Sequence, residues 1–332
     1  MKNLGKVILA VTAVLFLIGV TGCGMAGEKS VSDKPLLKIA ERDGGYEFLE
    51  GSEKVMFYQR DVKSADGKFP RNNYVHPLYG LDGEVLTEDF PKDHLWHRGV
   101  FWAWHQIYVG DKRVSDGWMC ENISWDVYKA AFLNTGPESI ALKVKVDWKS
   151  PKWTDEKGEQ KPFIKETSVI TVHRAKGDIR MIDFEIGLLA MEKGVRIGGS
   201  EDPKGYSGFS IRLPLPDDMV FTGEKGEVEP TVLAIEAGPW MDISGTLAEG
   251  LPVRGVAILC HKTSPQYPEK WILRRKTSMQ NAAYPGGGTV EIPCDKPLVL
   301  RYRLVVHRGD AGNLNLEKLQ AEYNKKTDFV LN

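Results

Sequence analysis

The spacing of apolar side chains along the chain indicates a protein built almost entirely from β-strands. Every second residue from Ile140 to Trp148 is apolar, and the residues between them are small or charged. This period of two is typical of a strand that packs one face on a core. Residues 168–173 and 179–188 form a similar pair across Ala-Lys-Gly-Asp, a turn sequence that predicts a hairpin. Residues 253–260 and 298–307 add two more predicted strands.

One helix is predicted, close to the C-terminus. Asn313 is its predicted N-cap, and Leu314, Leu316, Leu319 and Tyr323 form an approximate apolar stripe at helical spacing. The pattern therefore predicts a single amphipathic helix after the last strand.

The fold class follows from the number of strands and the scarcity of helices. About 300 residues of strands need two extended sheets that face one another, so we expect an all-β fold, a large antiparallel β-sandwich with one C-terminal helix. Residues 35–330 contain no repeat and no long linker, and are predicted to form one domain. The charged segment 151–163 is predicted to be a hairpin loop at one rim.

The N-terminus has the features of an export signal. Lys2 and Lys6 precede an apolar run from Val7 to Val20, which is shorter than the roughly 20 residues of a membrane-spanning helix. Residues 20–23, Val-Thr-Gly-Cys, resemble the bacterial lipobox. We therefore predict a lipoprotein signal peptide over 1–22 and a tether over 23–34; an ordinary signal peptide with a chance cysteine is the alternative.

The lipobox resemblance also predicts a location. Acyl chains such as palmitate on Cys23 would hold the protein at the bilayer of the cell envelope without a transmembrane helix in the mature chain. Gly24, rather than an aspartate, follows the cysteine. That resemblance implies the outer membrane or cell surface in a Gram-negative host.

Net charge limits the classes of binding partner, and the cysteine count limits the possible disulfides. The chain has 44 Lys and Arg against 45 Asp and Glu, a net charge of −1, which lacks the basic excess of a nucleic-acid-binding protein. Carbohydrates, as small molecules or oligosaccharides, are the expected partners. Cys120, Cys260 and Cys294 remain after lipidation, and either one disulfide with one thiol or three thiols is compatible with the sequence.

One short stretch gathers most of the candidate chemistry. Residues 89–106 contain His94, His97 and His105, three of the seven histidines, together with Asp93 and Arg98. Imidazole suits general acid–base work, and a guanidinium can hold carboxylate or ring oxygens. The tryptophans in the same stretch have flat faces that suit a sugar ring.

Strand geometry divides this stretch into two parts. On a straight strand His97 and His105 would share a face but lie about 26 Å apart, and Gly99 could close that gap only partly by a bulge. Trp102 and Trp104 would point to the opposite face. His94 and His97 lie in the loop before the strand and are therefore the better pair. His-x-x-His is also half of a metal site, which leaves a metal centre open.

Two other segments supply further candidates. The glycine-rich segment 198–214 carries Glu201, Lys204 and Arg212, and its glycines allow close approach of a ligand to the backbone. The segment 257–275 places His261 just past a strand and includes Trp271. The alternative interpretation is that the first segment is a rim loop and that His261 is structural.

These segments together resemble a known family. Six segments in order are similar to the secreted bacterial family often labelled PmoA-like, a domain of unknown function. They are residues 77–80, Asp93-His94, His97-Arg98-Gly99, Lys204-Gly205 to Arg212, the His261 segment and residues 302–310. The resemblance covers about residues 50–310. Family members commonly have Asp-His-Pro where this chain has Cys260-His261-Lys262, so an aspartate that would orient His261 is missing.

The resemblance implies a fold and a kind of chemistry. It implies a galactose-mutarotase-like β-sandwich, and enzymes of that fold act on sugars with His, Arg and acidic residues that project from a concave sheet. The label of methane oxygenase does not transfer, because such a membrane subunit needs several apolar spans of about 20 residues.

The leading functional hypothesis is an exported lipoprotein enzyme that isomerises, eliminates or cleaves a sugar by acid–base chemistry. His94 and His97 are the candidate acid–base pair, Arg98 the clamp, His261 a second proton-transfer group and Glu201 a general base. The expected substrate contacts are Asp93, Trp102, Trp104, Lys204, Arg212 and Trp271. The alternatives are a non-catalytic glycan-binding lipoprotein and a metal-dependent enzyme that uses His94 and His97. The sequence identifies no cofactor.

Overall fold

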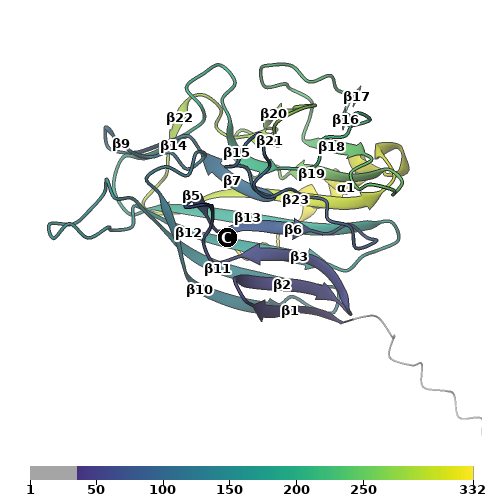
Figure 1. Cartoon of the computed structure of the whole chain (residues 1–332), viewed down its shortest axis with the longest axis horizontal. Coiled ribbons are helices and arrows are strands. Elements are labelled where there is room, and N and C mark those ends of the chain that lie inside the picture. Colours follow the sequence, from purple (N-terminus) through teal and green to yellow (C-terminus); the bar gives the residue numbers. More distant parts are fainter. Residues whose placement is uncertain (1–35, 332) are drawn as a thin grey trace, which may run out of the picture. The chain divides into compact units, whose positions relative to one another are not determined.

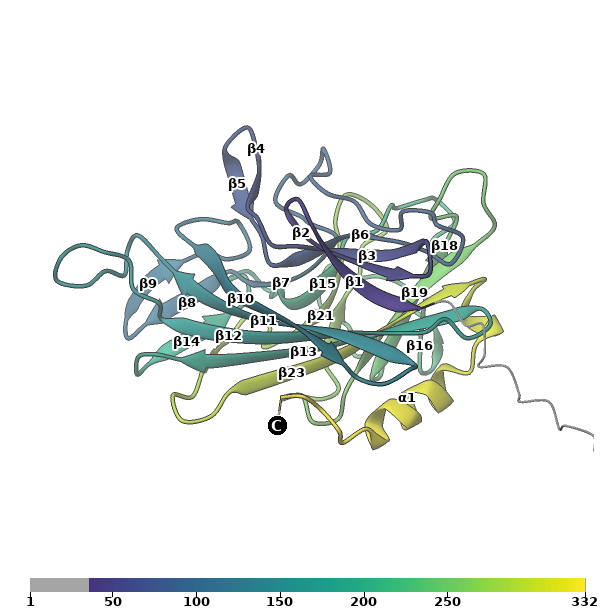
Figure 2. The same ribbon diagram turned by 90° about the horizontal axis from the view of Figure 1, so that it is seen from below.

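Two large antiparallel sheets face one another and enclose the main hydrophobic core (Figures 1 and 2). The computed structural model describes residues 36–331. The first sheet has eight strands in the order β1 (Leu37–Arg42), β2 (Gly45–Glu50), β3 (Glu53–Gln59), β6 (Tyr74–Leu78), β7 (Val100–Trp104), β15 (Ser207–Ile211), β21 (Gln280–Ala283) and β20 (Lys270–Ile272).

The second sheet has nine strands. Their order is β10 (Ser124–Asn134), β11 (Ser139–Lys149), β12 (Ile164–His173), β13 (Ile179–Ala190), β23 (Leu298–Arg308), β19 (Arg254–Cys260), β18 (Trp240–Gly245), β16 (Val220–Gly223) and β17 (Gly226–Glu227). Figure 2 shows β10 to β13 and β23 as a layer beneath β1, β3 and β6.

Two small sheets and one α-helix complete the described chain. The small sheets are β22 (Thr289–Glu291), β14 (Val195–Gly198), β8 (Gln106–Val109) and β9 (Lys112–Ser115) in that order, and the pair β4 (Lys63–Ala65) and β5 (Lys68–Arg71). The 3₁₀ turn η1 (Ala311–Asn313) precedes α1 (Leu316–Lys325), which lies against the outer face of the nine-stranded sheet (Figure 2). The fold is thus an antiparallel β-sandwich with one α-helix near the C-terminus, as predicted.

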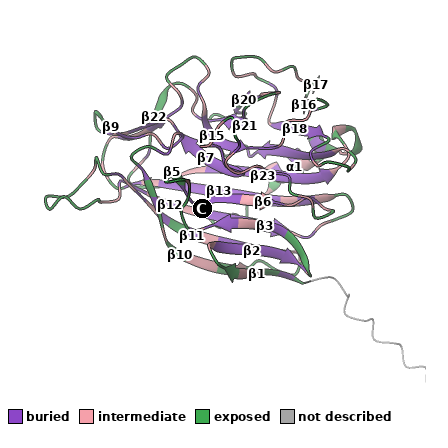
Figure 3. Ribbon diagram, in the orientation of Figure 1, coloured by how far each residue is buried: buried purple, intermediate pink, exposed green. Residues whose placement is uncertain are grey.

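The alternation of side chains defines an inner and an outer face for each sheet. On β7, Trp102 and Trp104 point into the core between the sheets, whereas Phe101 points outward into a second apolar cluster. On β19, Ile258 points inward and Leu259 outward, into a third cluster beneath α1. Figure 3 shows the central strands buried along most of their length.

A buried carboxylate ties the two sheets together. Glu166 on β12 accepts hydrogen bonds from the indole of Trp148 at 2.9 Å and, across the core, from the indole of Trp102 at 3.0 Å. Asn73 and Ser168 donate to the same carboxylate. Because these hydrogen bonds meet at one carboxyl group buried in the core, the network holds the facing sheets in one relative position.

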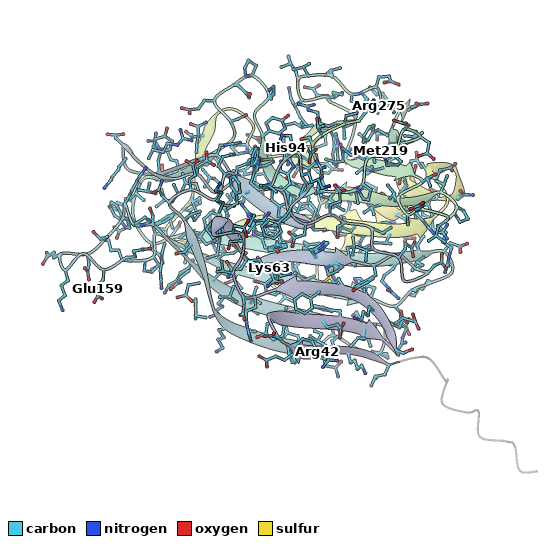
Figure 4. All side chains as sticks on the ribbon, in the orientation of Figure 1. Arg42, Lys63, His94, Glu159, Met219 and Arg275 are labelled. Carbon is cyan, nitrogen blue, oxygen red and sulfur yellow. The ribbon has the colours of Figure 1, made fainter. Side chains whose placement is uncertain are left out.

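The structure confirms most of the predicted elements and corrects the helix start. The predicted strand over 140–148 is β11, and the predicted hairpin is the antiparallel pair β12 and β13. The segment 151–163 is an exposed loop between β11 and β12, with Glu159 far out on it (Figure 4). The N-cap is Asn315, whose side chain accepts a bond from the amide of Lys318, rather than Asn313, because residues 311–313 form a separate 3₁₀ turn.

The described cysteines form no disulfide. Cys120 and Cys260 are buried and Cys294 is exposed, and all three are free thiols. The predicted signal peptide, the lipidated Cys23 and the tether lie outside the described residues. In residues 36–331 no helix combines the length and apolar character needed to cross a bilayer.

Candidate functional site

The loop over residues 89–98 brings a histidine pair to the outer face of the eight-stranded sheet. The amide of His94 donates to the carbonyl of Pro91 at 3.0 Å, and the amide of His97 donates to the carbonyl of His94 at 2.9 Å. These two successive turns stack the imidazole rings of His94 and His97, which are 4.7 Å apart between centroids and within 4° of parallel. The pairing predicted from the sequence is therefore present.

Gly99 lets this loop run directly into β7. A Cβ at this position would collide with the carbonyl oxygen of Val75 on the neighbouring strand β6. The carbonyl of Gly99 also accepts a bond from the amide of Arg212 at 2.7 Å. The glycine thus serves close packing of two backbones rather than a bulge.

Arg212, at the end of β15, holds the acidic side of the loop. Its Nη2 donates to both carboxylate oxygens of Asp93 at 2.9 and 3.0 Å, and its Nε donates to Glu88 at 2.8 Å. Burial on its own would raise the pKa of Asp93, but the charge and hydrogen bonds of Arg212, aided by His94, leave that pKa below its ordinary value. Asp93 is therefore a carboxylate, 3.6 Å from Nδ1 of His94.

The two stacked histidines differ in their access to solvent. His97 is only 2% exposed, whereas the side chain of His94 is 30% exposed. Burial, with the nearby charges of His94 and Arg212, lowers the pKa of His97 to about 2. His97 is thus a neutral ring at physiological pH, and His94 is the member of the pair that a ligand can reach.

Arg98 lies beneath the loop with its guanidinium engaged by the protein. It is fully buried and donates to the carbonyls of Leu95, His97 and Phe69. Its guanidinium also covers the ring of Phe90 at 3.6 Å from the centroid. These contacts shape the loop, and because the side chain is fully buried, with Nε 3.5 Å from Asp89, Arg98 cannot be the substrate clamp expected from the sequence.

A second histidine–carboxylate pair lies on the same face. Nδ1 of His105 is 3.0 Å from the carboxylate of Asp116, and the imidazole stacks on the indole of Trp118 at 5.4 Å. The ring of His97 contacts the same indole at 6.1 Å. We call His94, His97 and His105, with Asp93, Asp116 and Trp118, the histidine patch.

The patch corrects the expected separation of His97 and His105. A separation of about 26 Å assumed a straight strand, but β7 ends at Trp104 and β8 starts at Gln106, so the chain turns at His105. Sequence reasoning ranked His105 low and missed Asp116 and Trp118. The hairpin turn at Gly110 was the available signal, because folding residues 106–115 back on themselves brings Asp116 to His105.

An open pocket of about 510 Å³ adjoins the His94 end of the patch. Asp93, Glu88 and Arg212 line it together with His76 and Lys92. A ligand there would meet two carboxylates held by one guanidinium, beside the exposed ring of His94. This arrangement can exchange a proton and bind hydroxyl groups.

The three tryptophans expected to contact substrate lie in the core. Trp102, Trp104 and Trp271 are at most 2% exposed, and their indole N–H groups donate to Glu166, the carbonyl of Tyr284 and the carbonyl of Gly238. Their flat faces therefore pack between the sheets and offer no surface to a sugar. The half-buried Trp96 and Tyr206 are the aromatic side chains at the edge of the patch.

His261 lies on the far side of the sandwich. It follows β19 of the nine-stranded sheet and packs edge-on against Tyr323 and Phe329, at 4.9 and 4.8 Å. Burial, together with the charge of Arg301, lowers its pKa to about 4. The structure therefore does not bring His261 together with His94 and His97.

The two remaining candidates lie on an exposed rim loop between β14 and β15. Glu201 pairs with Arg113 at 2.8 Å, and Lys204 lies near Asp202 at 3.4 Å. Arg113 also donates to the carbonyl of His105 at 3.0 Å, which places the Glu201 carboxylate at the outer edge of the patch.

Residues 36–331 contain no complete set of side chains for binding a metal ion. No three His, Cys, Asp or Glu side chains in this part of the chain come together in a way that could hold a metal ion. His94 and His97 stack face to face, so the structure offers no third ligand to complete a His-x-x-His site.

Comparison with known proteins places the chain in a family. No curated protein matches it. The model of a family of unknown function, DUF6807, matches residues 46–321, a range that includes every residue of the histidine patch and both large sheets except β1 and the first residue of β2. The chain therefore belongs to the DUF6807 family.

Proposed function

We propose that the protein is an exported carbohydrate-active enzyme whose acid–base site is the histidine patch. The observation that carries the proposal is the convergence of Asp93 with Arg212, from a distant strand, in the wall of an open pocket, with Nδ1 of His94 3.6 Å from the Asp93 carboxylate. Proton transfer near neutral pH needs an accessible imidazole beside a group that orients it, and His94 beside Asp93 fits that need.

The roles within the patch follow from burial. His94 is the proton-transfer group, and the neutral ring of His97 supports it by stacking. Asp116 orients His105 as a second histidine–carboxylate pair about Trp118. Trp96 and Tyr206 supply the partly exposed aromatic surface on which a sugar ring can lie. The reaction is an isomerisation, elimination or hydrolysis that needs proton transfer only.

The finer assignments extend the same proposal. The PmoA-like resemblance of the His97-Arg98-Gly99 and Lys204-to-Arg212 segments supports a galactose-mutarotase-like sandwich that acts on sugars. A lipobox at Cys23 supports an acyl anchor at the cell envelope. Mass spectrometry of the N-terminal peptide from membrane-bound protein tests the anchor: an acylated Cys23 supports it, and a chain cleaved elsewhere without acyl groups contradicts it.

Turnover of a panel of oligosaccharides by purified protein tests the function. We expect activity that falls on the order of 10²-fold in His94→Gln, since general acid–base catalysis contributes at least that much. His173→Gln, a histidine change on the outer face of the other sheet, is the matched control and should retain activity. Saturable sugar binding without turnover would instead favour the non-catalytic glycan-binding lipoprotein. Unchanged turnover in His94→Gln would remove this histidine from the mechanism.

A further inference from the structure

A second pocket, of about 530 Å³, lies beside the histidine patch. Lys204 and Tyr206 form one wall, the segment 229–232 another, and Arg274 and Arg275 follow strand β20. We call it the basic pocket. In Figure 4, Arg275 and His94 both lie in the upper half of the molecule.

The basic pocket carries a local excess of positive charge in a chain whose net charge is −1. Its lining has three cations, Lys204, Arg274 and Arg275, and one carboxylate, Glu229. Glu229 lies 2.9 Å from Arg275, and Asp202, outside the lining, lies 3.4 Å from Lys204, so each of these two cations has one carboxylate partner. The pocket thus favours an anion.

Arg274 supplies the uncompensated charge. Its guanidinium donates to the carbonyls of Thr231, Val232 and Leu273, and to the hydroxyl of Tyr206. Within residues 36–331, no carboxylate lies within 4 Å of it. The neutral partners fix the guanidinium in place, so its charge is held at the pocket without a counter-ion from the described chain.

Tyr206 joins the basic pocket to the histidine patch. Its ring is 5.3 Å from the guanidinium carbon of Arg274 on the pocket side. It also contacts the indole of Trp118 at 5.6 Å, and Trp118 stacks on His105. One partly exposed aromatic ring therefore forms the boundary between the two sites.

The rim of the pocket adds apolar surface. Val232 is 67% exposed and stands next to the carbonyls that hold Arg274. A binding site with cations, one aromatic ring and a short apolar rim suits a ring-shaped ligand with an anionic substituent. A free inorganic anion would leave the aromatic and apolar parts unused.

We propose that the basic pocket binds the carboxylate or sulfate of an acidic sugar unit, and that the adjoining unit of the same glycan reaches the histidine patch across Tyr206. The substrate class is therefore an acidic oligosaccharide. This inference rests on the proposed function for its second half, whereas anion binding by Lys204, Arg274 and Arg275 stands on the pocket alone.

Calorimetric titration of the full mature chain with three oligosaccharides of equal length tests the inference: one with uronic acid units, one sulfated and one neutral. We expect at least one acidic glycan to bind on the order of tenfold more tightly than the neutral one, because a hydrogen bond between two charged groups is stronger than one between neutral groups. The advantage should shrink at high salt. Whichever acidic glycan binds more tightly identifies the substituent.

Variants separate the pocket from general charge effects. Arg274→Gln with Lys204→Gln should abolish the preference for acidic glycans, and Lys276→Gln, an exposed neighbour outside the pocket, should retain it. If Arg274→Gln weakens folding, Lys204→Gln alone should still reduce the preference. Equal binding of neutral and acidic glycans, or a preference that survives the double change, would overturn the inference.

The outcomes also separate this inference from the proposed function. If neutral glycans are turned over in a way that depends on His94, and acidic glycans are not preferred, the anion-binding role of the basic pocket is wrong and the proposed enzyme activity stands. Binding of acidic glycans that depends on Lys204 and Arg274, without any turnover, supports anion binding in the basic pocket and contradicts the proposed enzyme activity. Failure of every glycan to bind contradicts both.

Discussion

A single nitrogen of Arg212, Nη2, reaches both carboxylate oxygens of Asp93, at 2.9 and 3.0 Å. The two residues are far apart in the sequence, and Arg212 is almost fully buried. This contact is the link between the loop over 89–98 and strand β15. The position of His94, which follows Asp93, therefore depends on it.

Arg212→Gln should lower both stability and activity. Arg212 is buried but its acidic partners are partly exposed, so loss of these charge-assisted hydrogen bonds should cost about 1.5–3 kcal/mol, and Asp93 would lose the charge that lowers its pKa. Urea unfolding and glycan turnover measure the two effects. Arg212→Lys, which keeps the charge but not the bond geometry, should give an intermediate loss. A free energy of unfolding unchanged in Arg212→Gln would contradict this account of the loop.

His97 should resist protonation and make the protein sensitive to acid. Its pKa is about 2 in the folded state and about 6.5 in the unfolded chain. Below pH 6.5 the unfolded chain takes up a proton that the folded protein does not, so stability falls as pH decreases, by about 1.4 kcal/mol per pH unit.

Two measurements check this assignment. In NMR spectra, the His97 imidazole should show no titration between pH 5 and pH 8. His97→Phe, which keeps a flat ring against Trp118, should lose less stability than the wild type when the pH is lowered from 7 to 5. A His97 resonance that titrates near pH 6 would show that burial does not hold this ring neutral.

Asp116→Asn should reduce turnover while the fold is retained. Asn can still contact Nδ1 of His105, but it removes the negative charge and can present the wrong hydrogen-bonding group, so the imidazole loses its fixed tautomer. We expect a smaller loss than that of His105→Gln, which removes the ring and should cost on the order of 10²-fold. Turnover unaffected in both variants would confine the chemistry to His94.

The histidine patch shows what could be predicted from the sequence and what could not. The loop position of His94 and His97 followed from local signals, namely Pro91 and the continuous apolar run that starts at Val100. The pairing of His105 with Asp116 depends on a hairpin register, which a one-residue slip would change. Local patterns do not specify such a register when the strands are as short as β8 and β9.

The misplaced candidates have a common physical cause. Alternation along β7 indicated that Trp102 and Trp104 point away from His97, but it did not indicate which face is the core. The position of His261 could not be predicted for a similar reason. The sequence shows that it follows a strand, but it does not show to which of the two sheets that strand belongs. In this fold β19 pairs with β18 and β23, and its outer face is covered by α1.

The last prediction concerns Glu269, a buried acid outside both proposed sites. It precedes β20, is 2% exposed, and lies beside the buried side chains of Cys260 and Tyr302, away from any cation that pairs with it in residues 36–331. Burial raises its pKa from 4.5 to about 7. Between these values the folded protein holds a proton that the unfolded chain has released, so stability falls as pH rises from 4.5 towards 7, by about 3 kcal/mol in all.

Glu269→Gln should remove this loss, because a glutamine of nearly the same shape carries no charge at any pH. The variant should match the wild type at pH 4 and exceed its free energy of unfolding by about 3 kcal/mol at pH 8, as measured by urea unfolding. Glu249→Gln, an exposed position, is the matched control and should follow the wild type throughout. Parallel curves for Glu269→Gln and the wild type would mean that Glu269 titrates as it does in the unfolded chain. His97 makes the protein less stable as pH falls, whereas Glu269 makes it less stable as pH rises. Replacing His97 should therefore shift the pH of maximum stability downward, and replacing Glu269 should shift it upward.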